Sequence, residues 1–160
     1  MLKLTKKADY ALIAMKHLTV VRPRSASAKE IADRYGVPVP VLSKVLQKLA
    51  RGGFLTSEHG TNGGYRLAGD PDGISVLKVI RAIDGPVVLT SCFTESGDDC
   101  EHQERCNIRD PLRRVHDGIL AVLANMSMTE LAAEPEVHAN GAAAAQYVKF
   151  SSPDLTVLNP

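Results

Sequence analysis

Three cysteines, Cys92, Cys100 and Cys106, are the residues of this chain best suited to chemistry. They are the only cysteines in 160 residues and follow the spacing Cys-x7-Cys-x5-Cys. An odd number of thiols cannot all pair within one chain, and clustered cysteines in a cytosolic protein are more typical of a metal or redox site than of a disulfide framework. Thiolates are soft ligands that suit iron–sulfur clusters, zinc or Cu(I). We therefore expect a sulfur-ligated cofactor in this segment.

A four-iron cluster takes four protein ligands, so three thiols require a fourth donor. His102 and His116 are candidates from local spacing alone, although exposed histidines are common. Acidic side chains also crowd the segment, and we expect them to be solvated and to keep it away from DNA phosphates; they are Glu95, Asp98, Asp99, Glu101 and Glu104.

Other uses of the thiols stay open at this point. A zinc site could combine three Cys with one His, and a metal-free thiol switch needs no further ligand. A cysteine-dependent enzyme would need a base beside its nucleophile, and His102 near Cys100 is the only local hint. Because no phosphate-binding glycine motif or catalytic elbow accompanies it, we do not expect an enzyme.

The elements before the cysteines predict a helix-turn-helix. Thr5 can cap a helix that runs to about residue 20, and Ser27 with Glu30 forms a capping box for a short helix that Gly36 ends. A further helix spans 39–51, with an apolar face at the i, i+3, i+4, i+7 positions. Two short helices joined by a tight glycine turn, after a longer first helix, are typical of this DNA-binding motif.

A wing is expected next. Residues 54–57 and 65–67 suit two short strands, and the turn between them, 58–64, is rich in glycine. Ser75 then caps a helix that ends near Asp84.

A long helix follows the cysteines. Asp110 is expected as its cap, with Pro111 at the first helical position. The apolar positions approximate a heptad seam, which favours a dimer helix over a helix packed on its own domain; they are Leu112, Val115, Ile119, Leu123 and Met126. Ser127 and Glu130 form a second capping box for a final turn.

The expected fold is therefore mainly α with a small β-wing: a winged helix-turn-helix plus a long dimerisation helix. We divide the chain into a DNA-binding domain (1–86), a cysteine loop (87–109), the dimerisation helix with its following turn (110–134) and a tail expected to be mobile (135–160).

Charge is distributed unevenly. Residues 1–67 hold 12 of the 19 Lys and Arg but only 4 of the 18 Asp and Glu. A basic first half suits a polyanion such as DNA. No apolar run is long enough to span a membrane and the N-terminus lacks a signal core, so a cytoplasmic protein without a membrane partner is expected.

The order of these signals resembles the Rrf-two superfamily of winged-helix regulators, of IscR, NsrR and SUF-regulator type. The matching stretches are Leu4–Leu12, Glu30–Ala32, Leu49–Leu55, Ser57–Ala68, Ile74–Gly85 and the cysteine loop, together roughly residues 2–132. The resemblance implies a homodimer, joined by the long helix, that binds a palindromic operator on double-stranded DNA. It further implies an iron–sulfur cluster that senses iron, redox or nitric oxide status, and a regulator that commonly represses transcription.

The same resemblance implies a fourth cluster ligand. IscR-like members carry a histidine three positions after the third cysteine, where this chain has Arg109. NsrR-like members instead use an aspartate on the first helix of the partner subunit, and the matching residue here is Asp9. Three cysteines plus Asp9 resemble the branch with a [4Fe-4S] rather than a [2Fe-2S] cluster. The cysteine spacing differs from that of both types.

The DNA contacts follow from the helix-turn-helix placement. The recognition helix should direct its N-terminal half at base edges, with Pro40, Ser43, Lys44 and Gln47 in place for this. Lys48, Arg51, Lys6, Lys7 and Lys29 are expected on phosphates. The wing would contribute His59, Asn62, Gly63, Gly64, Tyr65 and Arg66, although Tyr65 suits a core anchor equally well.

Overall fold

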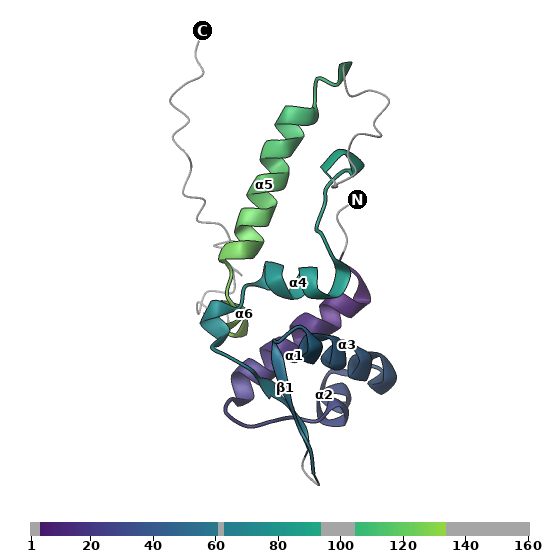
Figure 1. Cartoon of the computed structure of the whole chain (residues 1–160), viewed down its shortest axis with the longest axis vertical. Helices are drawn as coiled ribbons and strands as arrows, with labels where there is room; N and C mark the ends of the chain where they lie inside the picture. Colours follow the sequence, from purple (N-terminus) through teal and green to yellow (C-terminus); the bar gives the residue numbers. More distant parts are fainter. Residues whose placement is uncertain (1–3, 61–62, 94–104, 134–160) are drawn as a thin grey trace, which may run out of the picture.

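The computed structural model describes residues 4–60, 63–93 and 105–133 (Figure 1). A compact lower body holds the helix-turn-helix and wing, and α5 rises from it as a long arm. The elements are α1 (Lys6–Val21), α2 (Ala28–Tyr35), α3 (Val39–Arg51), β1 (Leu55–Glu58), β2 (Gly64–Leu67), the 3-10 turn η1 (Pro71–Gly73), α4 (Val76–Asp84), the 3-10 turn η2 (Ser91–Phe93), α5 (Arg109–Asn125) and α6 (Met128–Ala132).

α1 lies at the centre of the core. Thr5 caps it by accepting the Ala8 amide at 3.2 Å, as the sequence predicts. Its fully buried positions include three alanines, which let α3, α4 and α6 pack closely around it. Met15 and Leu18 on the same helix fill the remaining space between these elements.

The two predicted capping boxes differ in the structure. The Ser127 box is complete, because the Glu130 carboxylate also accepts the Ser127 amide at 2.7 Å. At Ser27 only half of it forms: the hydroxyl accepts the Glu30 amide, but the Glu30 carboxylate pairs with Arg24 at 3.3 Å. The second half of that prediction is therefore wrong, because Arg24 competes for the Glu30 carboxylate. Gly36 ends α2 in the left-handed conformation, at φ 65°.

The wing is a two-stranded antiparallel hairpin in which Leu55 faces Leu67 and Glu58 faces Gly64. Backbone hydrogen bonds between Ala26 and Tyr65, of 3.0 and 2.9 Å, join β2 to the segment before α2. A Cβ on Gly64 would lie 2.6 Å from the Ala26 carbonyl oxygen, so this close backbone approach requires glycine.

The arm begins two residues earlier than expected. α5 starts at Arg109 with Ile108 as N-cap and no side-chain cap, so Asp110 lies in the first turn and is not the cap. At its other end α5 is joined to the body, because the Val76 amide donates to Met126 and the Met128 amide to Ile74, at 2.9 and 2.8 Å.

The architecture confirms the expected fold class of a mainly helical chain with a small two-stranded wing. Met128 of α6 is fully buried in the same core as α1, so the end of the predicted dimerisation segment packs into the DNA-binding body. The proposed domain boundaries stay predictions, and the 135–160 tail lies outside the described residues. Among those residues, no helix has the length and apolar character that a membrane crossing requires.

Candidate DNA-binding face and cysteine site

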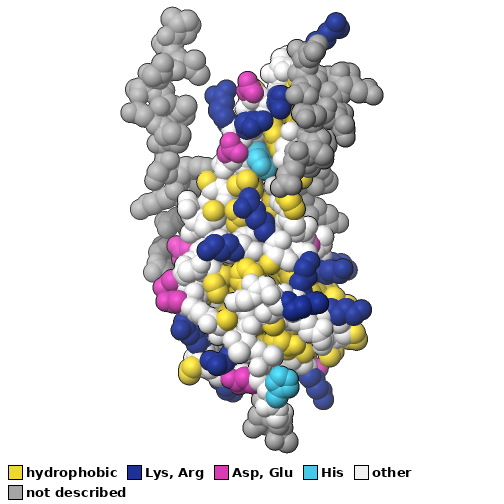
Figure 2. Space-filling model, viewed as in Figure 1, with side chains coloured by type: hydrophobic (Ala, Val, Ile, Leu, Met, Phe, Trp, Pro, Cys, Tyr) yellow, Lys and Arg dark blue, Asp and Glu magenta, His cyan; other side chains and the backbone are white. Residues whose placement is uncertain are grey.

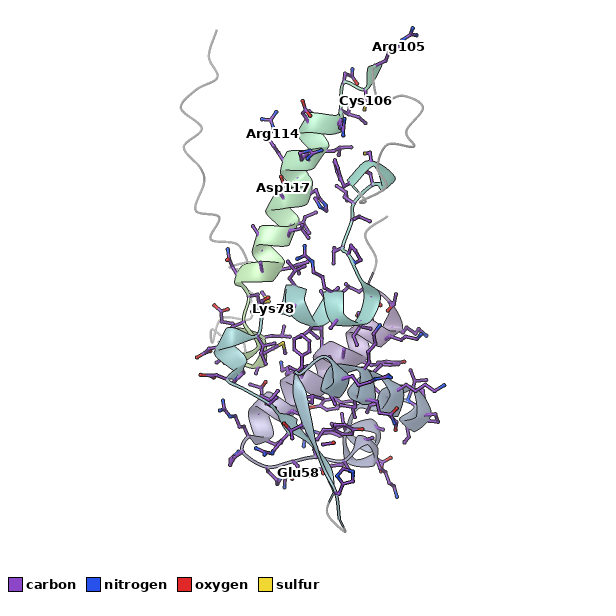
Figure 3. The ribbon with its side chains drawn as sticks, viewed as in Figure 1. Glu58, Lys78, Arg105, Cys106, Arg114 and Asp117 are labelled. Atoms are coloured by element: carbon purple, nitrogen blue, oxygen red, sulfur yellow. The ribbon has the colours of Figure 1, made fainter. Side chains whose placement is uncertain are left out.

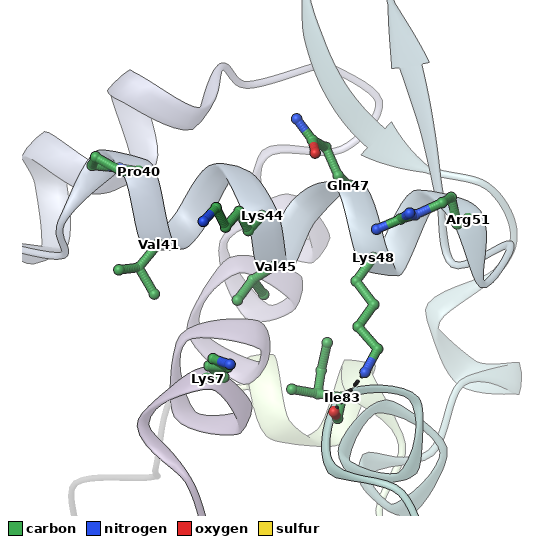
Figure 4. A pocket seen from close by; sticks show the side chains of 9 residues that line it. All are labelled: Lys7, Pro40, Val41, Lys44, Val45, Gln47, Lys48, Arg51 and Ile83. Carbon is green, nitrogen blue, oxygen red and sulfur yellow. Dashed lines mark hydrogen bonds between the residues drawn. The ribbon is translucent and has the colours of Figure 1, made fainter.

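One face of α3 is available for DNA. Its apolar face, with Leu42, Leu46 and Leu49, is buried against the core. The opposite face leaves Pro40 and Lys44 exposed beside Gln47. Ser43 is half-buried at the edge of that face. Figure 4 shows Pro40, Lys44 and Gln47 on this helix, so all four predicted base-reading residues lie on α3.

A basic hollow of about 430 Å³ runs along this helix, between α3, the start of α1 and the end of α4. Four cations line it, Lys7, Lys44, Lys48 and Arg51, and no acid does. Figure 2 shows Lys and Arg gathered on this flank of the body. The hollow therefore attracts a polyanion such as a DNA backbone.

Lys48 differs from its neighbours. Its Nζ donates a hydrogen bond of 2.8 Å to the backbone carbonyl of Ile83, in the last turn of α4 (Figure 4). Lys48, which is predicted to contact a DNA phosphate, is therefore hydrogen-bonded within the protein in this structure.

The wing residues are placed unevenly. His59 and Arg66 are exposed, and Arg66 Nε forms an ion pair of 2.6 Å with Glu58 on the adjacent strand. Gly63 and Gly64 are needed by backbone packing, because a Cβ on Gly63 would lie 2.7 Å from the Glu58 carbonyl oxygen. Asn62 lies outside the described residues.

Two further predicted contacts differ in exposure. Lys29 is exposed on α2, on the same body as the wing. Tyr65 is half-buried and packs against the hydrophobic core, which favours its alternative role as a core anchor.

The two described thiols lie toward the far end of α5. Cys92 and Cys106 are free and half-buried, and Cys92 Sγ is 2.9 Å from the Thr90 hydroxyl. Cys100 and His102 lie outside the described residues. Figure 3 shows Cys106 at the top of the arm and Glu58 of the wing at the opposite end of the molecule.

An aromatic stack fixes the Cys92 segment to the arm. The Phe93 ring lies 5.0 Å from the His116 ring, centroid to centroid, and the Arg113 guanidinium lies 5.6 Å from the Phe93 centroid. Such contacts are each worth about 0.5–1.5 kcal/mol. His116, proposed as a possible ligand, is engaged in this stack.

The donor set fits a sulfur-ligated cofactor in its chemistry, because both described thiols are free to bind metal. Asp9 is exposed on the first turn of α1. Within the described ranges, no three His, Cys, Asp or Glu side chains come close enough together to hold a metal ion. A metal site that uses Cys92 or Cys106 would therefore need donors from beyond those ranges or from a second copy of the chain.

Sequence reasoning missed the polar contacts that join α4 to its neighbours. The Thr5 hydroxyl donates to Asp84 at 2.7 Å, and the Thr5 amide to the same carboxylate at 3.3 Å. No local pattern signals a contact between residues 79 positions apart. In the sequence, only the capping role of Thr5 indicated that the start of α1 is held in place.

Sequence reasoning also missed His17, a buried polar side chain of α1. Its Nδ1 lies 3.2 Å from the Tyr35 hydroxyl, and its Nε2 has no partner among the described residues. Burial lowers the pKa of His17, and the nearby Arg34 and Arg24 lower it further while Glu30 opposes them. The neutral ring is therefore the form that suits the fold.

Comparison with known proteins identifies the family to which this chain is similar. Residues 4–134 match the model of the Rrf2 family, described as an iron-dependent transcriptional regulator. The transcriptional regulator IscR of Vibrio vulnificus is 33% identical over 137 residues, which are 85% of this chain and 80% of that protein.

Two solved structures of transcription regulators share this fold. CymR, the global cysteine regulator of B. subtilis, superposes with a TM-score of 0.70 at 28% identity, over 82% of this chain and 97% of that one. IscR of T. potens superposes with a TM-score of 0.64 at 26% identity, over 81% and 85%. These relatives are transcription regulators and not enzymes. The chain belongs to the Rrf2 family of DNA-binding transcription regulators.

Proposed function

We propose that this regulator, acting in the cytoplasm and most simply as a repressor, binds its operator according to the state of an iron–sulfur cluster held by Cys92, Cys100 and Cys106. The observation that carries the proposal is the pair of free thiols beside the arm, in a chain whose family is described as iron-dependent. Iron status, redox change or nitric oxide would each act by altering such a cluster.

A [4Fe-4S] cluster is the form we favour over [2Fe-2S], with Asp9 of the partner subunit as fourth ligand. Asp9 is exposed and therefore free to reach a second copy. An oxygen donor holds iron less firmly than a thiolate, which suits a sensor that must lose or alter its cofactor. The bound cluster would supply the redox and ligand chemistry; the chain supplies the donors and their link to the body.

A homodimer is part of the proposal. None of the residues of α5 is buried, and Ile108, Val115 and Val122 are 57%, 52% and 39% exposed at seven-residue intervals. That spacing forms a stripe on one face, as in a two-stranded coiled coil. Figure 2 shows hydrophobic atoms along the arm. A second copy would cover the stripe and present two recognition helices to a palindromic operator.

For DNA we propose that α3 enters the major groove, with Pro40, Ser43, Lys44 and Gln47 toward base edges. Lys29, His59, Asn62 and Arg66 would approach the backbone or the minor groove, while Gly63, Gly64 and Tyr65 shape the wing. Replacing Lys44 and Gln47 together by Ala should abolish the preference for operator over scrambled duplex. Weak, salt-sensitive binding should remain, because phosphate contacts supply it.

The deciding experiment is anaerobic purification followed by iron and sulfide counts and a visible spectrum. A [4Fe-4S] cluster gives about four irons and four sulfides per subunit. Asp9→Ala should then change the spectrum or speed cluster loss, whereas Asp33→Ala, an exposed acid on α2, should change neither. An unchanged cluster in the first variant removes Asp9 from the site.

A metal-free thiol regulator is the second candidate. It is favoured by the similarity to CymR, which is named a cysteine regulator. Colourless protein without iron, whose DNA binding responds to thiol oxidation and is insensitive to iron, would establish it. Zinc in place of iron would indicate the Cys3His alternative.

A further inference from the structure

Cys106 lies at the top of the arm and Glu58 of the wing at the opposite end of the molecule (Figure 3), and α3 lies in the body below α4 (Figure 1). Within one subunit, a signal from the cysteines to α3 must pass through the elements that lie between them. α4 is one such element, because it packs against α1, α3 and α5.

The N-terminal end of α4 is fixed to the base of the arm. The Val76 amide donates to Met126 and the Met128 amide donates to Ile74, which forms a short backbone ladder between α4 and the α5–α6 junction. Movement of the arm would therefore displace the start of α4 directly.

The C-terminal turn of α4 is held by polar side chains from two other helices. The Asp84 carboxylate accepts both the amide and the hydroxyl of Thr5, which is the cap of α1. The Ile83 carbonyl accepts Lys48 Nζ at 2.8 Å. The last carbonyls of a helix lack partners within it, and a cation is favoured there. Lys48 therefore supplies a cap to α4 from the recognition helix.

The same turn leads directly to the cysteines, because only six residues separate Gly85 from Cys92. We propose that the C-terminal turn of α4 couples the cysteine segment to the recognition helix, and that Lys48 is a positioning residue that holds α3 to this turn and makes no contact with DNA. This inference rests on the proposed function, because it assigns the route by which the cofactor would control operator binding.

The competing assignment for Lys48 is a phosphate contact, since it lines the basic hollow with Lys44 and Arg51. The two roles differ in a measurable way. Each phosphate contact adds about 0.9 to the slope of log affinity against log salt concentration, or about 1.8 for two copies in a dimer. A lysine that stays on the Ile83 carbonyl adds nothing to that slope.

The test compares Lys48→Met with two matched variants. Lys78→Met is the control, because Lys78 also donates to a backbone carbonyl, that of Gly73 at 3.0 Å, but only within its own segment. Arg51→Met is the reference for loss of a cation that faces the duplex. The DNA is a duplex selected by the wild-type chain from a random-sequence library. Affinity is measured by fluorescence anisotropy at several salt concentrations, with cluster-loaded and iron-depleted protein, and unfolding temperatures confirm that each variant is folded.

We expect Lys48→Met to keep the wild-type salt slope, as Lys78→Met does, while Arg51→Met lowers it by about 1.8. The fold difference in affinity between loaded and depleted protein, in whichever direction it lies, should shrink at least threefold toward one in Lys48→Met alone. A slope lowered as in Arg51→Met, or an unchanged ratio, overturns the inference while leaving the proposed function intact. A wild-type ratio of one would instead contradict the proposed function, and the coupling with it.

Discussion

Replacing Val115 by Lys should dissociate the homodimer proposed above. Val115 is 52% exposed at the centre of the apolar stripe on α5, between Ile108 and Val122. Fully burying a Val side chain is worth about 1.5–3 kcal/mol, so covering the exposed half contributes about 0.8–1.6 kcal/mol in each subunit. Two copies contribute about 1.6–3 kcal/mol to association, which corresponds to about 10–200-fold in the dimer dissociation constant.

Charge repulsion adds to this loss of apolar burial. Lysines at facing positions would repel each other, so the estimated change in the dimer dissociation constant is a lower bound. The matched control is Ala124→Lys, because Ala124 is exposed and lies nine residues further on, half a helical rotation from Val115. It adds the same charge on the opposite face of the arm.

Sedimentation equilibrium on the full chain measures the association, and circular dichroism checks that the helices persist. We expect Val115→Lys to be monomeric at concentrations where wild type and Ala124→Lys are dimeric. Equal association of both variants would show that the stripe is not the interface and would refute the argument from exposed apolar area.

Three other perturbations test the buried His17, the Phe93 stack and the wing. Because burial lowers the pKa of His17, the unfolded chain binds a proton that the folded chain resists, so stability should fall as pH drops below about 6.5; His17→Gln should flatten this dependence in chemical denaturation, whereas the exposed His59→Gln should not. Phe93→Ala removes the stack on α5 and should speed loss of the proposed cluster about 2- to 10-fold, measured as absorbance decay. An unchanged rate would show that the stack does not support the cysteine site. Glu58→Gln releases Arg66 and removes a negative charge near DNA, so duplex affinity in anisotropy titrations should rise about 2- to 10-fold; unchanged affinity would place the wing away from DNA.

Local patterns predicted the helix-turn-helix and wing well, because their signals lie within a few residues. The period of Leu42, Val45, Leu46 and Leu49 fixes both the extent and the buried face of α3. Gly36 marks the end of α2, since its left-handed backbone disfavours other residues.

Contacts that depend on how the backbone folds could not be predicted in the same way. Glu30 satisfies the capping-box pattern, yet Arg24 takes its carboxylate because the chain folds back beside it. The bonds from Lys48 to Ile83 and from Thr5 to Asp84 join residues 35 and 79 positions apart, which no periodicity reveals. The candidate cysteines were evident from their number and spacing, whereas the stack of Phe93 on His116 required the packed arm.

The proposed function requires that a cluster on the three cysteines controls operator binding. The most direct measurement is one anisotropy titration of anaerobic protein against the selected duplex, before and after iron is removed by a chelator, with iron counted on the same samples. We predict about four irons per subunit at the start and at least a tenfold change in affinity on their loss. Iron-free protein at the start, or identical affinity in both states, would contradict it.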